Sequence, residues 1–240
     1  MNGLYYQVVN EIRTQYRDVR YIILTLLLPL IVYLLADTIN RASYISLGNK
    51  WQIYLLVAMT SLGLMSTAIG EFSIRISTER SKGWTKMVRL TPLPRSHYLI
   101  AKLLSQVSLW IITVIVLFLV ASVFLHIYLL PITWIQLAIW LILASSSFIT
   151  WGFLIGMLGS ATQPVATLTL LALAVIGGLI QPINGLPIFI SQSFPTFLIL
   201  DNGLRIVEGL PFKWIDVIPL VIYSLITGGI AIMLDKRKKD

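Results

Sequence analysis

Short polar breaks divide the chain into six long apolar runs. Their approximate limits are residues 21–37, 52–70, 102–125, 134–158, 165–181 and 214–234. Because about 20 apolar residues are needed for a helix to cross a bilayer, each run predicts one membrane-spanning helix. Trp51, Trp134 and Trp214 stand near the starts of three runs, and indole rings favour the headgroup level. The pattern therefore predicts an all-α integral membrane protein with six transmembrane helices.

Two further segments predict helices that do not cross the membrane. In residues 1–20, apolar side chains recur at helical spacing and form one stripe, namely Leu4, Val8, Ile12, Tyr16 and Val19. This spacing predicts an N-terminal amphipathic helix that lies in the membrane interface. Residues 182–213 are apolar but contain Pro182, Pro187, Pro195 and Pro211. A spanning helix would not carry these prolines, so we expect one or two re-entrant helices that dip into the outer leaflet.

The composition agrees with this membrane assignment. Hydrophobic residues make up 57% of the chain and charged residues 12%, against roughly 45–50% and about 25% in a soluble domain. We expect one permease-sized domain over residues 1–240, in which residues 21–234 form the six-span bundle and residues 235–240 a basic tail. The absence of cysteine excludes disulfides and thiol nucleophiles, and the presence of only two histidines argues against a metal centre.

The basic residues predict the orientation of the chain in the membrane. The net charge is +8, and 14 of the 18 Lys and Arg lie in residues 1–20, 71–102 and 235–240. The other four are Arg41, Lys50, Arg205 and Lys213. By the positive-inside rule, both termini and the long loop of residues 71–102 face the cytoplasm. Because the positive charge lies in these breaks between apolar runs, it does not indicate nucleic-acid binding.

The apolar runs lack the groups that would drive transport or catalysis. None of the ten acidic residues lies in the middle of a run, and no phosphate-binding loop of the Walker type occurs. If the chain moves a cargo uphill, another polypeptide must therefore supply the energy. Ser145, Ser146 and Ser147 cluster with Thr150, and such a cluster could supply the nucleophile of an intramembrane serine hydrolase. Its base is missing, because His97 and His126 lie near the membrane boundaries, so we predict no catalytic residue and a packing role for these hydroxyls.

A transport pathway through such spans would be mainly apolar. The candidate pathway residues are hydroxyl groups in the second and fifth runs, namely Thr60, Ser61, Ser66, Thr67, Thr167 and Thr169. Helix packing explains each of these hydroxyls equally well. Neither run offers a charge at its centre, so a hydrophobic or amphipathic cargo such as a drug, peptide or lipid is favoured over a sugar or an ion.

The loop of residues 71–102 is the most informative segment. Gly83 permits a sharp change of direction, Trp84, Met87 and Val88 offer an apolar face, and Pro92 and Pro94 end any helix before the third run. The second run is expected to continue as a helix beyond the lipid and to lead into a short helix parallel to the membrane. An apolar knob ringed by charge is typical of a protein-docking element. The alternative is a basic anchor that contacts anionic lipid.

Two stretches resemble the type-2 exporter permeases of bacterial ATP-binding cassette transporters, which include the daunorubicin-type drug-resistance permeases. The first stretch reads Glu79-Arg80-Ser81-Lys82-Gly83-Trp84, then Leu90-Thr91-Pro92-Leu93-Pro94-Arg95, then Tyr98 and Lys102, and is similar to the family patterns E-R-E-x-G-T, T-P-L-x-R and Y-x-x-x-K. Ser81 replaces the second acid and Trp84 the threonine. The second stretch comprises Pro195 and Asp201-Asn202-Gly203-Leu204-Arg205, where Asn-Gly stands for the alanine of the family's D-A-L-R.

The resemblance implies a permease subunit of an exporter in the bacterial inner membrane. It would pair with a second permease chain and with separate ATPase subunits that bind ATP and Mg²⁺, so this chain would hold no cofactor. The ATPase-coupling residues implied by the resemblance are Glu79, Arg80, Gly83, Trp84, Met87, Thr91, Pro92, Leu93 and Arg95. Those implied for an extracellular gate are Pro195, Asp201 and Arg205. The alternative function is a substrate-binding membrane subunit of an importer, which has less need of a long, proline-bounded basic loop.

Overall fold

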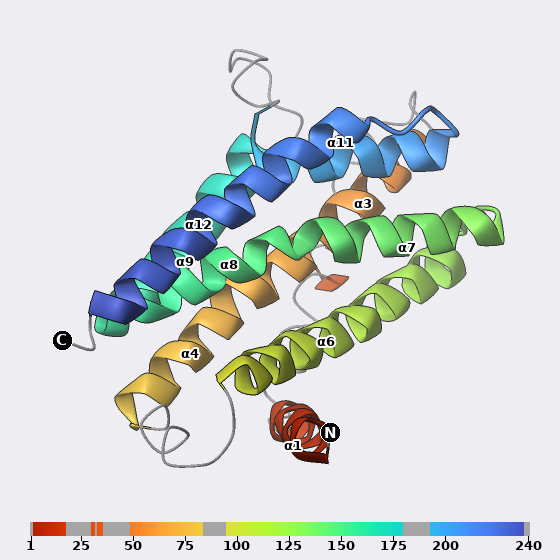
Figure 1. Cartoon of the computed structure of the whole chain (residues 1–240). Helices are drawn as coiled ribbons and strands as arrows, with labels where there is room; N and C mark the ends of the chain where they lie inside the picture. Colours follow the sequence, from red (N-terminus) through yellow and green to blue (C-terminus); the bar gives the residue numbers. More distant parts are fainter. Residues whose placement is uncertain are drawn as a thin grey trace.

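The computed structural model describes residues 2–17, 30–31, 33–35, 49–83, 95–179 and 193–237. Every secondary-structure element among these residues is a helix, so the predicted all-α class is confirmed for the described part of the chain. The long helices run side by side in one elongated bundle (Figure 1). The first apolar run, residues 21–37, lies almost entirely outside the described residues.

The second apolar run forms the best-buried helix of the bundle. It begins as α3 (Asn49–Met65), continues through one π-helical segment, η2 (Ser66–Glu71), and ends as α4 (Phe72–Ser81). The helix therefore extends well beyond the predicted run, as the sequence led us to expect. After α4, Gly83 adopts a left-handed conformation with φ of +71°, which only glycine adopts readily. The described helix thus ends at the glycine where the sequence predicts a change of direction.

The third, fourth and fifth runs form consecutive helices. They comprise α6 (Arg95–Phe124), α7 (Pro131–Ser145), α8 (Ser147–Ile155), the short η3 (Gly156–Ala161) and α9 (Thr162–Ile176). The chain reverses at Gly159, whose φ of +68° breaks the helix between α8 and α9. Because small residues let helices approach closely, the sequence of the fourth run predicts a packing face that contains Gly152, Gly156 and Gly159. That expectation was wrong for Gly159, since a Cβ there would meet nothing within 4 Å.

Gly152 and Gly156 do form a close helix contact. A Cβ at Gly152 would lie 1.9 Å from the carbonyl oxygen of Ala68, and one at Gly156 would lie 2.8 Å from Ile76. The absence of side chains therefore lets α8 approach the η2 and α4 segments at backbone distance. The serine-rich stretch beside these glycines also packs, because Ser147 is buried and Thr150 is hydrogen-bonded to Thr227 of α12 at 2.7 Å.

The last described part comprises α11 (Pro195–Glu208), η4 (Trp214–Asp216) and α12 (Val217–Arg237). Among the described residues, four helical stretches are long and apolar enough to cross a membrane: Lys50–Ser81, Ile100–Phe124, Pro131–Ile176 and Trp214–Ala231. The third of these contains the fourth and fifth predicted spans, separated at Gly159. The structure therefore supports a multi-pass helical membrane protein.

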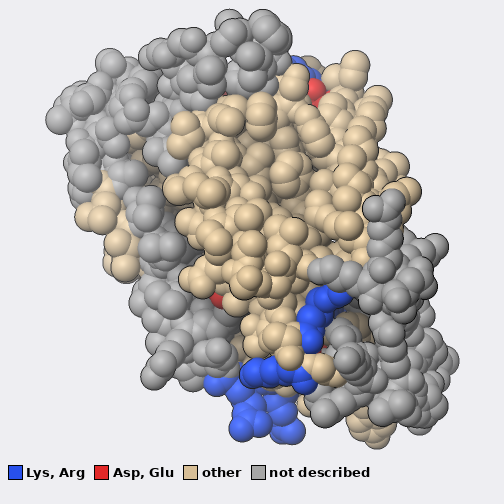
Figure 2. Space-filling model, turned by 90° about the vertical axis from the view of Figure 1, so that its left-hand side faces the viewer, with Lys and Arg blue, Asp and Glu red and all other residues tan. Residues whose placement is uncertain are grey.

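The two ends of the bundle differ in charge. Helix α1 (Asn2–Arg17), the end of α4, the start of α6 and the last described helix's C-terminal end lie toward one end, the lower one in Figure 1. Blue Lys and Arg atoms gather at this end in Figure 2, below a broad surface without charge. We call it the basic end and the other the α11 end. The predicted orientation places the basic end in the cytoplasm.

Candidate functional site

A buried lysine is the centre of a charge cluster at the basic end. The side chain of Lys102 is 1% exposed, and its Nζ lies 2.6 Å from Oε1 of Glu79 and 3.6 Å from Oε1 of Glu11. An ammonium group removed from water is costly unless it is paired with opposite charge. The two carboxylates therefore make the burial of Lys102 possible.

Two further side chains complete this cluster. Arg75 donates a hydrogen bond to Glu11, and its Nε lies 3.4 Å from Oε1 of Glu79. The Tyr98 hydroxyl donates to Oε2 of Glu79, and the Lys102 Nζ lies 4.9 Å from the centre of the Tyr98 ring. We call these five residues the Lys102 cluster. It holds two cations and two anions, so its formal charge is zero.

Burial raises the pKa of the Tyr98 phenol well above its usual value, and the negative charge of Glu79 raises the pKa further. The phenol therefore keeps its proton across the physiological pH range and remains a hydrogen-bond donor to Glu79. Tyr98 is positioned one turn before Lys102 on α6, so both side chains reach the same carboxylate. Glu79 thus accepts two charge-assisted hydrogen bonds from one face of α6, one from a neutral phenol and one from an ammonium group.

Helical spacing brings the cluster together from three helices. Arg75 and Glu79 lie four residues apart on α4, as do Tyr98 and Lys102 on α6, and residues at this spacing share a helix face. Helix α1 packs along α6 and supplies Glu11. Residues 84–94 connect α4 to α6 and lie outside the described residues. The cluster therefore ties together the two helices that flank this loop and links both to α1.

The structure describes only part of the predicted ATPase-coupling segment. Glu79, Arg80 and Gly83 are described, and Arg95 is the first residue of α6. The others lie outside the described residues, namely Trp84, Met87, Thr91, Pro92 and Leu93. Glu79 is 20% exposed and pairs with cations of its own chain, which indicates a positioning role at the base of the loop. The coupling role of the segment stays a prediction.

Sequence reasoning missed the inward face of α1. It predicted one apolar stripe, but Glu11 and Gln15 are the buried side chains of this helix, at 6% and 5% exposure. Leu4, Val8 and Ile12 are only half-buried, whereas Tyr5 and Tyr6 are exposed. The reason is that α1 contacts protein on its polar edge, where Lys102 and Arg75 compensate Glu11. The available signal was a lysine at the start of an apolar run, which we counted only as a topology charge.

Helix α11 lies close against three helices at the opposite end. It has 14 residues, which gives it a length of about 21 Å and makes it shorter than a membrane span. A Cβ at Gly203 would lie 2.6 Å from Val57 of α3 and 3.5 Å from Leu137 of α7, and one at Gly177 would lie 1.7 Å from Oγ1 of Thr196. The α11 helix therefore packs at close range against α3, α7 and the end of α9.

The predicted gate residues lie on this helix. Pro195 is buried at its first turn, where a missing N–H costs nothing. Oδ2 of Asp201 lies 3.0 Å from Nε of Arg205 and 2.8 Å from Nζ of Lys213. Asn202, fully buried, accepts a hydrogen bond from the Lys213 N–H at 2.9 Å. Asn202 and Gly203, which depart from the family pattern, are thus both in close contact with neighbouring segments, and the gate function stays a prediction.

The candidate pathway residues divide into two groups. Thr60, Ser61 and Thr67 are buried between helices, and each hydroxyl donates to a carbonyl of its own helix. Thr67 also accepts hydrogen bonds from Gln106 and Trp110 of α6, at 2.9 and 2.7 Å. The other group, Ser66, Thr167 and Thr169, is only partly buried or exposed. The hydroxyls of this second group also donate to carbonyls of their own helices, and the pathway role of both groups stays a prediction.

Comparison with known proteins gives one informative match. No family model matches the chain. The chain is 26% identical over 231 residues to the Bacillus subtilis (strain 168) protein named "Putative transport permease YvfS", and the match covers 94% of both chains. Together with the four long apolar helices among the described residues, this similarity supports a multi-pass membrane protein of a transport permease type.

Proposed function

We propose that the chain is the membrane-spanning subunit of an ATP-binding cassette exporter. It moves a hydrophobic or amphipathic cargo out of the cell with energy from ATP that a separate subunit hydrolyses. It pairs with a second permease chain, identical or closely related, in the bacterial inner membrane. The motif resemblance and the similarity to a transport permease along 94% of the chain support this assignment.

The observation that carries the proposal is the Lys102 cluster. A docking loop can transmit force only if both of its ends are held by stiff structure. Here Glu79 near the end of α4 is bonded to Tyr98 and Lys102 near the start of α6. The same carboxylate lies beside Arg75, which also bonds Glu11 of α1. A displacement of residues 84–94 therefore moves α1, α4 and α6 together as one unit.

The helix that leaves this unit continues into the bundle. Helix α4 is continuous with η2 and α3, so a displacement at Glu79 is passed along one helix to the α11 end. The π-helical turns of η2 interrupt its regular hydrogen bonding, and such turns are frequent at functional positions. In this mechanism ATP binding brings two ATPases together, the loops follow, and the permease pair switches between inward and outward openings.

The first experiment tests whether an ATPase docks on the loop. Trp84→Ala removes the proposed aromatic anchor, and such an anchor at the centre of an interface is worth about 2 kcal/mol or more, or about thirtyfold in affinity. The tagged chain is purified in mild detergent, and the co-purifying ATPase is quantified by its ATP hydrolysis. Trp214→Ala is the matched control, because it makes the same change at the α11 end, where Trp214 is 76% exposed.

We expect normal membrane abundance for both variants and loss of the ATPase only for Trp84→Ala. Equal recovery of the ATPase with both variants would support the alternative that the loop is a basic membrane anchor. The absence of any ATPase from the wild-type preparation would contradict the proposal. Transport assays in vesicles then fix the direction, since an exporter expels cargo to the side opposite the ATPase. Cargo uptake toward the ATPase side would favour the importer alternative.

A further inference from the structure

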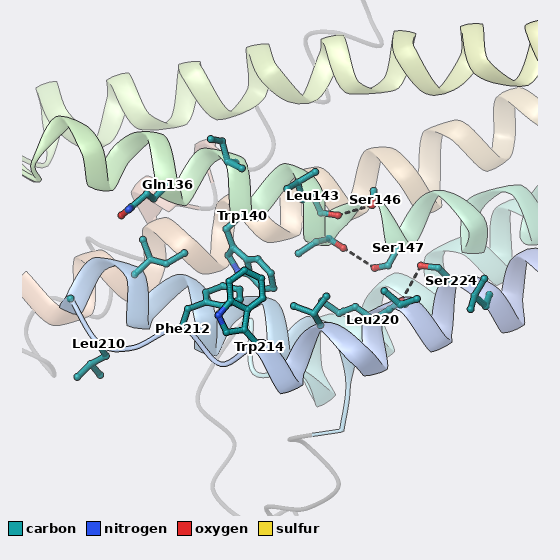
Figure 3. A pocket seen from close by; sticks show the side chains of 17 residues that line it. Gln136, Trp140, Leu143, Ser146, Ser147, Leu210, Phe212, Trp214, Leu220 and Ser224 are labelled. Atoms are coloured by element: carbon teal, nitrogen blue, oxygen red, sulfur yellow. Dashed lines mark hydrogen bonds between the residues drawn. The ribbon is translucent and has the colours of Figure 1, made fainter.

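A long apolar groove lies between α7 and α12, away from the Lys102 cluster. It has a volume of about 780 Å³, and its walls come from α7, the start of α8, the end of α11, η4 and α12. Figure 3 shows the side chains of the two walls facing each other across it. We call it the α7–α12 groove. Its volume falls within the range of roughly 300–1,000 Å³ that is usual for small-molecule sites.

The length of the groove matches one leaflet of a membrane. On α12 its wall runs from Val217 to Leu225, which is about 12 Å at the helical rise of about 1.5 Å per residue. On the other wall it runs from Gln136 to Ser147, or about 16 Å by the same rise. Half of the hydrocarbon core of a bilayer is about 15 Å thick. The groove therefore extends from the α11 end to about the middle of the membrane.

Few polar side chains line this length, namely Gln136 at one end of the α7 wall and three serines. The hydroxyls of Ser146, Ser147 and Ser224 donate to carbonyls of their own helices at 2.6, 2.8 and 3.0 Å (Figure 3). Leu143, Leu220 and the other aliphatic side chains fill most of the remaining lining. A hydrocarbon chain fits such a surface, because it brings no donor or acceptor that would need a partner.

Aromatic rings stand at one end of the groove. Phe212 packs edge to face against Trp140 at 4.8 Å and against Trp214 at 4.9 Å between ring centres. Trp214 is 76% exposed, as expected for an indole at the headgroup level of a bilayer. Charged groups of both signs follow directly, since Asp201 pairs with Arg205 and Lys213, and Asp216 accepts a hydrogen bond from Asn202. The end of the groove thus lies where a lipid would change from acyl chain to headgroup.

We propose that the α7–α12 groove binds one acyl chain of a membrane phospholipid, in the leaflet at the α11 end. The glycerol lies near Trp214, and the chain runs along Val221 and Leu225 toward the middle of the membrane. Because charges of both signs lie near this end, namely Asp201, Arg205, Lys213 and Asp216, the site does not select the headgroup by charge. This lipid is bound on the side of the bundle and is independent of the exporter assignment.

The test counts the phospholipid that stays bound after purification. The detergent-purified protein is mixed with phosphatidylcholine or with phosphatidylglycerol, and bound lipid per chain is measured by native mass spectrometry. Val221→Trp fills the groove from α12, and Ile222→Trp is its matched control, since the two side chains are 50% and 48% exposed but only Val221 lines the groove. Leu143→Trp and Ile135→Trp form the same pair on α7.

We expect retained lipid to fall at least fivefold in Val221→Trp and in Leu143→Trp, with either lipid, and to stay within twofold of wild type in both controls. Equal loss from groove and control variants would show only unspecific boundary lipid, and no loss in any variant would show that the groove is empty. A strong preference for one headgroup would contradict acyl-chain recognition. If the groove variants instead split a permease pair into single chains, the groove is a contact between copies and the proposal is wrong.

Discussion

At the basic end, four charged side chains and a tyrosine hold α1, α4 and α6 together, whereas at the α11 end two glycines and a buried asparagine let α11 lie against its neighbours. The first arrangement depends on charge balance in a buried place. The second depends on the absence of a side chain at Gly177 and at Gly203. The basic end should therefore be sensitive to removing a group and the α11 end to adding one.

The difference matches what each end does in the proposed mechanism. A unit that transmits force from an ATPase must keep its shape, and several charge-assisted hydrogen bonds fix the relative positions of three helices. A closure at the other end must open without exposing unpaired charge. Close contacts between small residues can separate at lower electrostatic cost than a buried ion pair.

The largest expected effect is an all-or-none difference in accessibility between the two ends. The chain has no cysteine, so single cysteines report the side of the membrane without further changes. Tyr128, at the α11 end between α6 and α7, is 83% exposed, and Lys82 is exposed at the basic end. In intact cells an impermeant maleimide should label Tyr128→Cys and not Lys82→Cys. Labelling of Lys82→Cys before the cells are opened would reverse the assignment of the two ends.

The next effect is the loss of charge balance at the basic end. Lys102→Met leaves Arg75 as the one cation of the cluster for both Glu79 and Glu11, and breaking a buried ion pair in this way typically costs about 3–5 kcal/mol. The free energy of unfolding in mixed micelles should fall by this order, and the variant should lose transport more than membrane insertion.

The double variant Lys102→Met/Glu79→Met is the control for this prediction. It removes one charge of each sign and leaves Glu11 paired with Arg75. Replacing both members of a buried pair by apolar groups is often close to neutral. We therefore expect it to regain most of the stability lost in the single variant. A double variant no more stable than Lys102→Met would show that Lys102 matters for packing rather than for charge.

The third-largest effect is expected from overpacking the contacts of the α11 end. Gly203→Ala places a Cβ 2.6 Å from Val57, and an added methyl in a packed contact costs about 1–3 kcal/mol. Gly229→Ala in α12 is the control, because a Cβ there meets nothing within 4 Å and alanine favours a helix over glycine. In thermal unfolding, Gly203→Ala should melt at a lower temperature than Gly229→Ala. Adding Val57→Ala to Gly203→Ala should restore its thermal stability. Equal stability of the Gly203 and Gly229 variants would contradict the close contact.

Local patterns in the sequence were sufficient to predict much of the bundle. Apolar runs identified the long helices, and the helix through Ser81 and the turn at Gly83 followed from composition and from the freedom of glycine. Pro195 and Gly209 mark the ends of α11, and Gly209 has the left-handed φ of +70° that ends many helices. These features depend on residues that are near each other in the chain.

The Lys102 cluster could not be predicted in this way. Arg75 and Glu11 are 64 residues apart, and Lys102 and Glu79 are 23 residues apart, so no local pattern joins them. A charge near the edge of an apolar run fits a solvated loop and a buried pair equally well until the partner is known. The π-helical turns of η2 carry no distinctive composition either, and close approach of α8 at Gly152 accompanies them.

The smallest expected effect concerns the charges of the α11 end. Asp201 and Arg205 are 25% and 23% exposed and lie four residues apart on one helix, and such pairs contribute about 0.3–0.5 kcal/mol. Even with Lys213 as a second partner, Asp201→Asn should lower the free energy of unfolding by less than about 1 kcal/mol. Salt should shrink this difference further, since partly exposed charges are screened.

Glu79→Gln makes the same change of acid to amide at the basic end. It removes the carboxylate charge nearest to a lysine that is 1% exposed. The resulting loss in the free energy of unfolding should therefore exceed that of Asp201→Asn several-fold and should change little with salt. Unfolding of both variants at low and high salt, in one detergent, measures the two differences side by side. Equal and equally salt-sensitive losses would mean that the Lys102 cluster is solvated like the surface pair, and α1, α4 and α6 would then lack the rigid joint that the coupling mechanism needs.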